Sequence, residues 1–336
     1  MVLLERMFGT RERFDYYECD SCGTIGIGAI PADMGPFYPD GYYSFGGGIS
    51  WKRRARLRFA ALARRLGNRS FSRGLGVDEV LQWLPLRGRI LDVGSGSGVL
   101  LQSLRCFCYN KCYGVDPFIP EDTTAHGVVL WKRELPDVEG LFDAIMMHHS
   151  LEHVPSPDEV FAELSRLLVE GGVLIVRVPV VPNAIYDEFG IDWPQLDAPR
   201  HIHTFTVKAL GLLAAKHGFS IVNIAYDSGQ WSLAVARSYA LGVALVDIPD
   251  SEKRGTPQDA AQVARWNDEE RGDQVRMVLT RRATVASASG PQDETPQDSR
   301  TAAQQWLPAD AASLVSRDVV YEKVESRAAG ADGCEQ

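Results

Sequence analysis

The hydrophobic pattern is most regular between residues 77 and 282. There, short apolar runs rich in β-branched residues alternate with stretches whose apolar residues recur at helical spacing. Strands that alternate with helices predict a mostly parallel sheet with helices on both faces. Seven such runs occur, in the order RILDVG, KCYGVDP, VVLW, FDAIMMH, GGVLIVRVP, FSIVNIAY and DQVRMVLT. We therefore expect an α/β fold with a doubly wound, mostly parallel, seven-stranded sheet.

Segments of a different pattern lie on both sides of this domain. Residues 1–48 are rich in Tyr, Gly and Pro and too irregular for one long helix, so they predict a small β-rich remnant. Residues 49–76 contain the run WKRRARLRFAALARRL at 51–66, which predicts a basic amphipathic linker helix. Residues 283–336 are polar and poor in large apolar side chains, so we expect a largely disordered tail.

The composition narrows the class of protein. With 336 residues, of which 45% are hydrophobic and 24% charged, the chain fits an ordinary globular enzyme. Its 35 Lys and Arg against 44 Asp and Glu give a net charge of −9, from which we expect no nucleic-acid partner. No apolar stretch approaches the roughly 18–20 residues that span a bilayer, and the charged first residues do not suit a signal peptide. We expect a cytoplasmic protein without a transmembrane segment.

The most specific motif is ILDVGSGSG at residues 90–98, an apolar strand that runs into glycines and then into a helical pattern. Glycines let the backbone approach a ligand closely, and the helix that follows offers free N–H groups. A dinucleotide-binding turn would need glycines at positions 94, 96 and 99, but position 99 is Val and the third glycine is Gly98. Asp92, just before the turn, also suits a ligand that carries an ammonium better than one that carries a pyrophosphate.

This motif resembles the first motif of the class I S-adenosylmethionine-dependent methyltransferases, an acid followed by G-x-G-x-G. The resemblance implies a Rossmann-like methyltransferase fold over residues 77–282, with S-adenosyl-L-methionine as the cofactor. It also implies that Gly94, Ser95, Gly96 and Gly98 hold the cofactor and that Asp92 lies near its methionine arm.

The next predicted strand adds two candidates at its carboxyl end. The run YGVDP at 113–117 places Asp116 and Pro117 there, and a carboxylate at this position can accept hydrogen bonds from both ribose hydroxyls. Taken alone, Asp116 is explained equally well as a residue that caps or turns the strand. Together with the glycine turn, it predicts a cofactor contact.

A further segment follows the strand that begins with FDAI at 142–145. The run HHSLEHVPSP at 148–157 resembles the methyltransferase pattern L-E-H-V-x-x-P. In that family the segment lies beside the methyl-bearing sulfur, so His148 is a candidate cofactor contact and His149 a candidate catalytic residue. Glu152 and His153 are expected to orient and pack the head of the next helix.

An insertion at about 182–206 follows the fifth strand. Its run WPQLDAPRHIHTF at 193–205 resembles the W-x-x-L-D-x-P-R-H-x-x-x-F segment of a methyltransferase subgroup that carries an N-terminal zinc ribbon. Members of the subgroup lie in pathways for surface glycans, lipids or secondary metabolites, which implies a small-molecule or glycan-type acceptor, with a sugar hydroxyl favoured. Tyr186, Trp193 and Arg200 are the candidate acceptor contacts.

Two histidines of this insertion are candidate bases. His201 and His203 are two residues apart, so in an extended segment they point to the same side. An imidazole titrates near neutrality and can take a proton from a sugar hydroxyl. The alternatives are that one ring only holds the loop by hydrogen bonds, or that transfer needs no base.

The N-terminal segment contains a cysteine pair. Cys19-x-x-Cys22 resembles one knuckle of a zinc ribbon, which needs four ligands. No second knuckle precedes residue 106, so zinc is not expected in this chain alone, and two chains sharing one metal is the remaining route. The oligomeric state is open. The basic helix at 51–66 could contact an anionic acceptor or a membrane surface, but a solvated face is favoured.

Two other functions remain open. A nucleotide-dependent oxidoreductase can use the same sheet, but Val99 and Asp92 disfavour it. A catalytically silent binding protein would keep the methyltransferase fold and bind no cofactor, or bind it without turnover. The intact glycine turn favours the enzyme.

Overall fold

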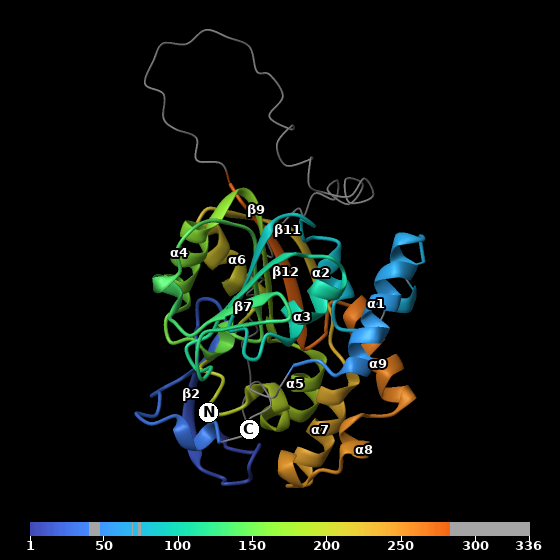
Figure 1. The fold of residues 1–336 in the computed structure, drawn as a ribbon. Helices are drawn as coiled ribbons and strands as arrows, with labels where there is room; N and C mark the ends of the chain where they lie inside the picture. The colour runs from blue at the N-terminus through green and yellow to red at the C-terminus, as the bar shows by residue number, and fades with distance from the viewer. Residues whose placement is uncertain (40–47, 69, 73–74, 283–336) are drawn as a thin grey trace, which may run out of the picture.

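The computed structural model describes residues 1–39, 48–68, 70–72 and 75–282, and its centre is an eight-stranded sheet (Figure 1). The strand order is β11-β12-β9-β8-β4-β5-β7-β6. The strands are β4 (Arg89–Val93), β5 (Lys111–Val115), β6 (Thr123–Ala125), β7 (Val128–Trp131), β8 (Phe142–His148), β9 (Leu168–Pro179), β11 (Phe219–Tyr226) and β12 (Gln274–Arg281). The five central strands β4, β5, β7, β8 and β9 run parallel.

This sheet confirms the predicted doubly wound, mostly parallel architecture. The seven expected strands are all present, and β12 lies antiparallel between β9 and β11. The eighth strand, β6, is a three-residue exposed edge strand that pairs antiparallel with β7. The sequence of β6 carries no apolar alternation, so its hydrophobic pattern gave no sign of it.

Successive residues of the central strands enter two different cores, which explains their continuous apolar runs. Ile90 belongs to the core on one face of the sheet and Leu91 to the core on the other. Helices α1 to α3 cover the first face and α4 and α6 the second, as Figure 1 shows. These helices are α1 (Trp51–Arg65), α2 (Asp78–Leu81), α3 (Val99–Cys106), α4 (Pro157–Leu167) and α6 (Val207–Lys216).

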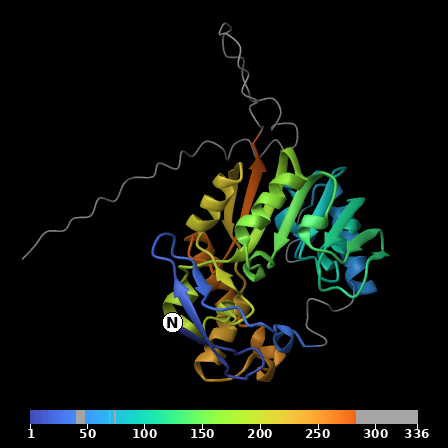
Figure 2. The ribbon, with the colours of Figure 1, turned by 90° about the vertical axis from the view of Figure 1, so that its left-hand side faces the viewer.

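The N-terminal strands form a second sheet together with a piece of the insertion. Its order is β1-β2-β3-β10, all antiparallel. The strands are β1 (Val2–Leu4), β2 (Arg13–Glu18), β3 (Ile25–Ile27) and β10 (His203–Thr204). Figure 2 shows this small sheet beside the insertion, below the central sheet. The N-terminal segment and the insertion therefore share one core, in which Phe14, Tyr16, Phe37 and Trp193 are buried.

The remaining elements complete this lower part of the molecule. Helix α5 (Ala184–Phe189) belongs to the insertion, and α7 (Gln230–Ala240), α8 (Asp250–Lys253) and α9 (Pro257–Asp268) lie between β11 and β12. The hydrophobic pattern did not predict α7 to α9 individually. Short 3-10 helices are η1 (Gly35–Phe37), η3 (Ser70–Ser72), η4 (Leu135–Asp137), η5 (Leu151–His153), η6 (Gly190–Asp192), η7 (Pro194–Leu196) and η8 (Leu245–Asp247).

Two further expectations concern the tail and the absence of a transmembrane segment. The predicted tail at 283–336 lies outside the described residues. None of the helices among the described residues is both long and apolar enough to cross a membrane.

Candidate active site

The glycine motif forms a tight turn between β4 and α3. Gly94, Gly96 and Gly98 all have positive φ angles, of 74°, 49° and 72°, which L side chains rarely adopt. A Cβ on Gly94 would lie 2.5 Å from the Cβ of Ser150, so this position has no room for a side chain. The turn ends at Gly98, which caps the amino end of α3. The predicted strand, turn and helix are therefore present, with backbone N–H groups at the start of the helix.

Asp116 closes the turn from the end of the neighbouring strand. Its Oδ2 accepts a hydrogen bond from the N–H of Gly96 at 2.9 Å, and its Oδ1 accepts one from the N–H of Phe118 at 2.9 Å. The residue is buried, with 6% of its surface exposed. A carboxylate has about four lone-pair positions, so each oxygen can still accept a hydrogen bond from a hydroxyl group. Pro117 follows it and is half-buried.

Asp92 is the second acid at this edge of the sheet and is also buried. Burial, and then the charge of Asp116, raises the pKa of Asp92 to about 7. An uncompensated carboxylate inside a protein is costly, and a bound ammonium would favour the ionised form. The contact of Asp92 with the methionine arm stays a prediction, and a bound ammonium would compensate its charge.

The end of β8 places the next two candidates at the same edge. His148 is the last residue of β8, and its Nε2 is buried without a hydrogen-bond partner among the described residues. Burial, followed by the charge of Arg177, lowers the pKa of His148 to about 3. At neutral pH this imidazole is therefore uncharged, which suits a contact to a neutral or cationic part of a ligand.

His149 belongs to a chain of polar contacts rather than to a free site. It has a positive φ of 51°, and its Nε2 accepts a hydrogen bond from Nη1 of Arg177 at 3.2 Å. Arg177 is in turn held by Asp227, whose two oxygens accept from its Nε at 3.1 Å. Because Nε2 accepts, the proton of a neutral His149 resides on Nδ1, which lies 3.3 Å from Oε1 of Glu152. Its catalytic role stays a prediction.

The two histidines of the insertion occupy different surroundings. His201 is buried against His153, with ring centroids 4.7 Å apart. His203 is half-buried in β10, and its Nε2 lies 3.4 Å from the carbonyl oxygen of Pro155. No hydrogen bond, ion pair or ring contact between described residues joins the two imidazoles. If the chain uses a base, the structure makes these two histidines alternatives rather than a pair.

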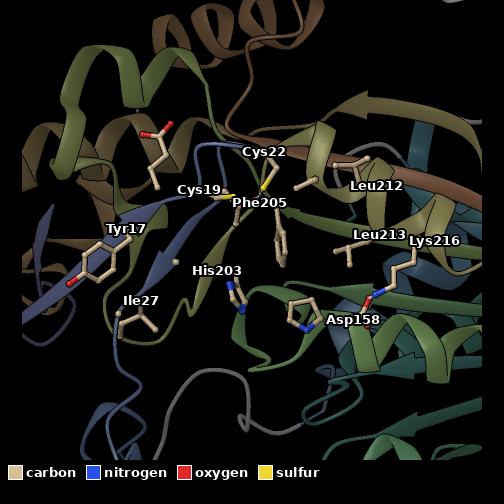
Figure 3. A pocket seen from close by; sticks show the side chains of 16 residues that line it. Tyr17, Cys19, Cys22, Ile27, Asp158, His203, Phe205, Leu212, Leu213 and Lys216 are labelled. Atoms are coloured by element: carbon tan, nitrogen blue, oxygen red, sulfur yellow. Dashed lines mark hydrogen bonds and ion pairs between the residues drawn. The ribbon is translucent and has the colours of Figure 1, made fainter.

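His203 lines a hollow of about 700 Å³ between the small sheet and helix α6, shown in Figure 3. Its lining is mostly apolar, with Phe205 and Leu213 at one side and Lys216 near its edge. The glycine turn does not contribute to this lining. The hollow is therefore separate from the predicted cofactor site.

The candidate acceptor contacts Trp193 and Arg200 are buried and already bonded. The indole Nε1 of Trp193 donates to Oδ2 of Asp273 at 3.0 Å. Arg200 is fully buried between Asp197 and Glu5, at 2.5 and 3.2 Å. These contacts connect the insertion to the N-terminal segment and to β12. Acceptor binding by these residues stays a prediction, and their packing favours a structural role.

Tyr186 differs from these two because it is partly exposed. It lies on α5 and packs edge to face on Trp193, with ring centroids 5.8 Å apart. Burial, followed by the charge of Glu18, raises the pKa of its hydroxyl. It remains available as an acceptor contact.

The cysteine pair lies on the small sheet at the wall of the hollow. Figure 3 shows the sulfur atoms of Cys19 and Cys22 close together. Cys22 Sγ lies 3.4 Å from Oγ1 of Thr24, and this hydrogen bond lowers the pKa of the thiol. No third cysteine, histidine or acid among the described residues joins the pair into a metal-ligating group.

The fold creates one cluster that no sequence motif predicts. Glu152 and His153, which were expected to orient and pack the head of a helix, both lie against His201 of the insertion. The L-E-H and P-R-H motifs that carry these residues were both visible. Their meeting depends on the path of the insertion, which no periodicity indicates.

Comparison with known proteins identifies the domain around this turn. A family model described as a methyltransferase domain matches residues 58–224. The tRNA U34 carboxymethyltransferase of Syntrophotalea carbinolica is 33% identical over 110 residues, which are 29% of this chain and 34% of that protein. The enzyme of the same name from Psychromonas ingrahamii is 32% identical over 158 residues, 42% of this chain and 47% of that protein. The chain spans less than half the length of these curated relatives.

A solved structure also matches over a large part of the chain. The match to the S-adenosylmethionine-dependent methyltransferase from Mesorhizobium loti covers 60% of this chain and 96% of that one. The two share 16% sequence identity, and the TM-score is 0.41.

The names of the curated relatives correct one expectation. We expected no nucleic-acid partner and a small-molecule acceptor, and relatives named for a tRNA overturn that expectation. The expected absence of a nucleic-acid partner rested on the net charge of the whole chain, and the small-molecule acceptor rested on the resemblance of the insertion to a methyltransferase subgroup. Residues 283–336 hold nine acids and only four Lys or Arg, so more than half of that negative charge lies outside the domain. Association with a polyanion depends on the local field, and the chain also carries a strongly basic helix.

Proposed function

Because the chain belongs to the class I S-adenosylmethionine-dependent methyltransferases, we propose that it transfers a methyl group from that cofactor to a nucleotide of an RNA chain. The observation that carries this proposal is a basic, aromatic helix that begins beside the cofactor turn. The similarity to tRNA-modifying relatives supports it independently.

The residues of the turn fit the cofactor. The glycine backbone offers a surface without side chains, Asp116 offers acceptors for hydroxyl groups, and buried Asp92 offers a negative charge for an ammonium. When bound, S-adenosylmethionine supplies a methyl group that is already activated by its sulfonium. The protein then has to align the acceptor, exclude water and, where the acceptor carries a proton, receive it.

Helix α1 connects the basic surface to this turn. Its N-cap is Ser50, and the N–H of the preceding Ile49 donates to Oε1 of Gln102 at 3.2 Å. Gln102 lies on α3, and its Nε2 donates to the carbonyl oxygen of Ser97 in the turn at 3.2 Å. The amino end of α1 is therefore two hydrogen bonds away from the turn. A polyanion bound along α1 would lie close to the cofactor.

The exposed face of α1 has the chemistry that RNA requires. Lys52, Arg56 and Phe59 follow the i, i+4, i+7 spacing that places residues on one side of a helix. All three are exposed, as is Trp51, which has 75% of its surface accessible. Cationic side chains bind phosphates and aromatic rings stack on bases. An apolar or neutral acceptor would have no use for this combination.

Binding of bulk transfer RNA at several salt concentrations tests the acceptor class. We expect log K to fall linearly with log salt. In the Lys52→Gln/Arg56→Gln variant the slope should decrease by about 1–2 units, since each lost phosphate contact removes about 0.7–0.9. The double variant should bind S-adenosylmethionine as the original chain does, because neither side chain touches the turn.

The matched control is Arg87→Gln/Lys111→Gln. It removes two exposed charges near the amino ends of β4 and β5, at the edge of the sheet opposite the turn. We expect this variant to keep the RNA affinity and the salt slope. If both double variants change the slope equally, or if neither does, α1 is not the RNA-binding surface. Methyl transfer to glycan precursors without any transfer to RNA would reject the proposed acceptor.

A further inference from the structure

A compact group of potential metal ligands lies where the insertion meets the turn after β8. Glu152 and His153 belong to η5, and His201 belongs to the insertion. The two segments are fixed to each other, because the N–H of Ile202 donates to the carbonyl oxygen of Glu152 at 2.8 Å. One ligand atom of each of the three side chains lies within 4.8 Å of the other two.

Both imidazoles are oriented as they are in metal sites. Nδ1 of His153 donates to the carbonyl oxygen of Arg200 at 2.8 Å, and the Tyr38 hydroxyl lies 3.3 Å from the same nitrogen. Nδ1 of His201 donates to the carbonyl oxygen of Gln195 at 2.7 Å. Carbonyl oxygens only accept, so each Nδ1 carries a proton, and in the neutral form of each ring Nε2 keeps its lone pair. Metal-bound histidines almost always donate their other ring N–H to such a partner.

The carboxylate of Glu152 lacks the hydrogen bonds that a buried charge requires. The residue is fully buried, and neither oxygen accepts a hydrogen bond of good geometry from any described residue. The nearest polar group is Nδ1 of His149, at 3.3 Å from Oε1. An ionised carboxylate buried in a protein costs several kcal/mol unless its charge is compensated. A cation between the carboxylate and the two imidazoles would remove that cost.

The adjacent carboxylate of Asp197 does not compete for this role. It lies 4.0 Å from Nε2 of His201, but Arg200 already donates to both of its oxygens, at 2.9 and 2.5 Å. Asp197 therefore neutralises Arg200, while Glu152 has no cationic partner other than the histidines.

From this geometry we propose that Glu152, His153 and His201 bind one divalent first-row transition ion of the Zn²⁺ type. Two imidazoles and one carboxylate are a ligand set that such ions prefer, and they leave a coordination position for water. Ligand atoms in a tetrahedral site lie about 3.3–3.6 Å apart, so small side-chain rotations close the site from its present spacing. The inference does not depend on which acceptor the chain uses.

Titration of the full chain with Co²⁺ tests the site directly. The protein is purified without a histidine tag and stripped with a chelator, and binding is followed by the visible absorption of Co²⁺ bound to nitrogen and oxygen ligands. We expect one equivalent to bind, and Zn²⁺ to displace it. Glu152→Gln and His153→Ala should weaken binding by more than about 100-fold, since even partners that only orient a ligand cost about 10–100-fold.

Two further variants keep the test decisive. Cys19→Ser/Cys22→Ser should bind Co²⁺ unchanged, and loss of binding there would assign the metal to the cysteine pair instead. His153→Cys should bind Co²⁺ and add a sulfur-to-cobalt charge-transfer band, which only a ligand at this position can produce. The far-ultraviolet circular dichroism of each metal-free variant shows whether it is folded.

Two further results would overturn the proposal. One is the absence of stoichiometric Co²⁺ or Zn²⁺ binding by the folded, tag-free chain. The other is binding that persists in both Glu152→Gln and His153→Ala.

Discussion

The N–H of Gly96 donates a 2.9 Å hydrogen bond to Oδ2 of Asp116, across the carboxyl ends of β4 and β5. The most flexible residue type in the turn is thereby tied to an acid 20 positions later in the sequence. This bond sets the shape of the turn and leaves the acid at the position where a ribose is expected. Turn geometry and cofactor binding should therefore fail together when Asp116 is changed.

The first prediction follows from this bond. Asp116→Ala should weaken S-adenosylmethionine binding by about 10–100-fold, because charge-assisted hydrogen bonds contribute about 1.5–3 kcal/mol. Asp116→Asn keeps one acceptor oxygen and should lose less. Isothermal titration calorimetry of both variants measures the difference. Equal affinity for the cofactor in all three proteins would remove Asp116 from the site.

The second prediction concerns the pH dependence of cofactor binding. Since the pKa of Asp92 is raised to about 7, acidification protonates the partner of the cofactor ammonium, which stays protonated below its own pKa of about 7.7–8.0. The dissociation constant should rise roughly tenfold between pH 7.5 and 6. Asp92→Asn should bind more weakly and show no such dependence. A wild-type dissociation constant that is flat with pH would contradict the assignment of Asp92.

The same raised pKa has a consequence for stability. The folded pKa of Asp92 lies above its unfolded value of about 4, so its contribution is fully present below pH 4. It is lost as the pH rises through 7, because the buried carboxyl must then ionise. Without cofactor, the unfolding free energy of Asp92→Asn minus that of the original chain should therefore be larger at pH 8 than at pH 5. Urea unfolding at the two pH values measures this change.

A third prediction compares two glycines with similar positive φ angles. Gly94 and Gly171 have φ angles of 74° and 71°, but a Cβ on Gly94 would lie 2.5 Å from Ser150, whereas one on Gly171 meets nothing within 4 Å. Gly171→Ala should cost about 1–2 kcal/mol for its left-handed backbone alone. Gly94→Ala should cost a further 1–3 kcal/mol or so for the crowding and should impair cofactor binding. Equal losses of unfolding free energy would show that Ser150 moves aside freely.

A fourth prediction concerns Arg200, which is fully buried between Glu5 and Asp197. Arg200→Met leaves two buried carboxylates without their shared cation and should lower the free energy of unfolding by about 3–5 kcal/mol. The matched control is Arg271→Met, because Arg271 pairs with Asp187 on the surface and such pairs contribute about 0–1 kcal/mol. Chemical denaturation of both variants measures the difference. Equal losses of unfolding free energy in the two variants would contradict a structural role for the buried Arg200 ion pairs.

The cofactor half of the site was predictable because it depends on local sequence. A strand that ends in ILDVGSGSG and one that ends in YGVDP must bring Asp92, the glycines and Asp116 to one edge of a parallel sheet. The family and its cofactor follow from those few residues. Likewise, the basic run at 51–66 folds as α1, Trp51–Arg65.

The acceptor half was not predictable in the same way. Its shape depends on β10, which pairs with β3, about 180 residues earlier in the sequence. A pairing over such a distance cannot be predicted from the local hydrophobic pattern. In the structure His201 is buried against His153, whereas His203 is half-buried beside Pro155, and Arg200 is buried between Glu5 and Asp197. The net charge of the whole chain also led to the wrong expectation that no nucleic acid is a partner. It averages the acidic last residues with the basic face of α1.

The most direct test of the central claim is transfer of a tritium-labelled methyl group from S-adenosylmethionine to bulk transfer RNA by the full chain. We predict nuclease-sensitive label in the RNA, reduced in Lys52→Gln/Arg56→Gln and retained in Arg87→Gln/Lys111→Gln. Unlabelled RNA, from a chain that binds the cofactor and has been loaded with Zn²⁺, would contradict the account.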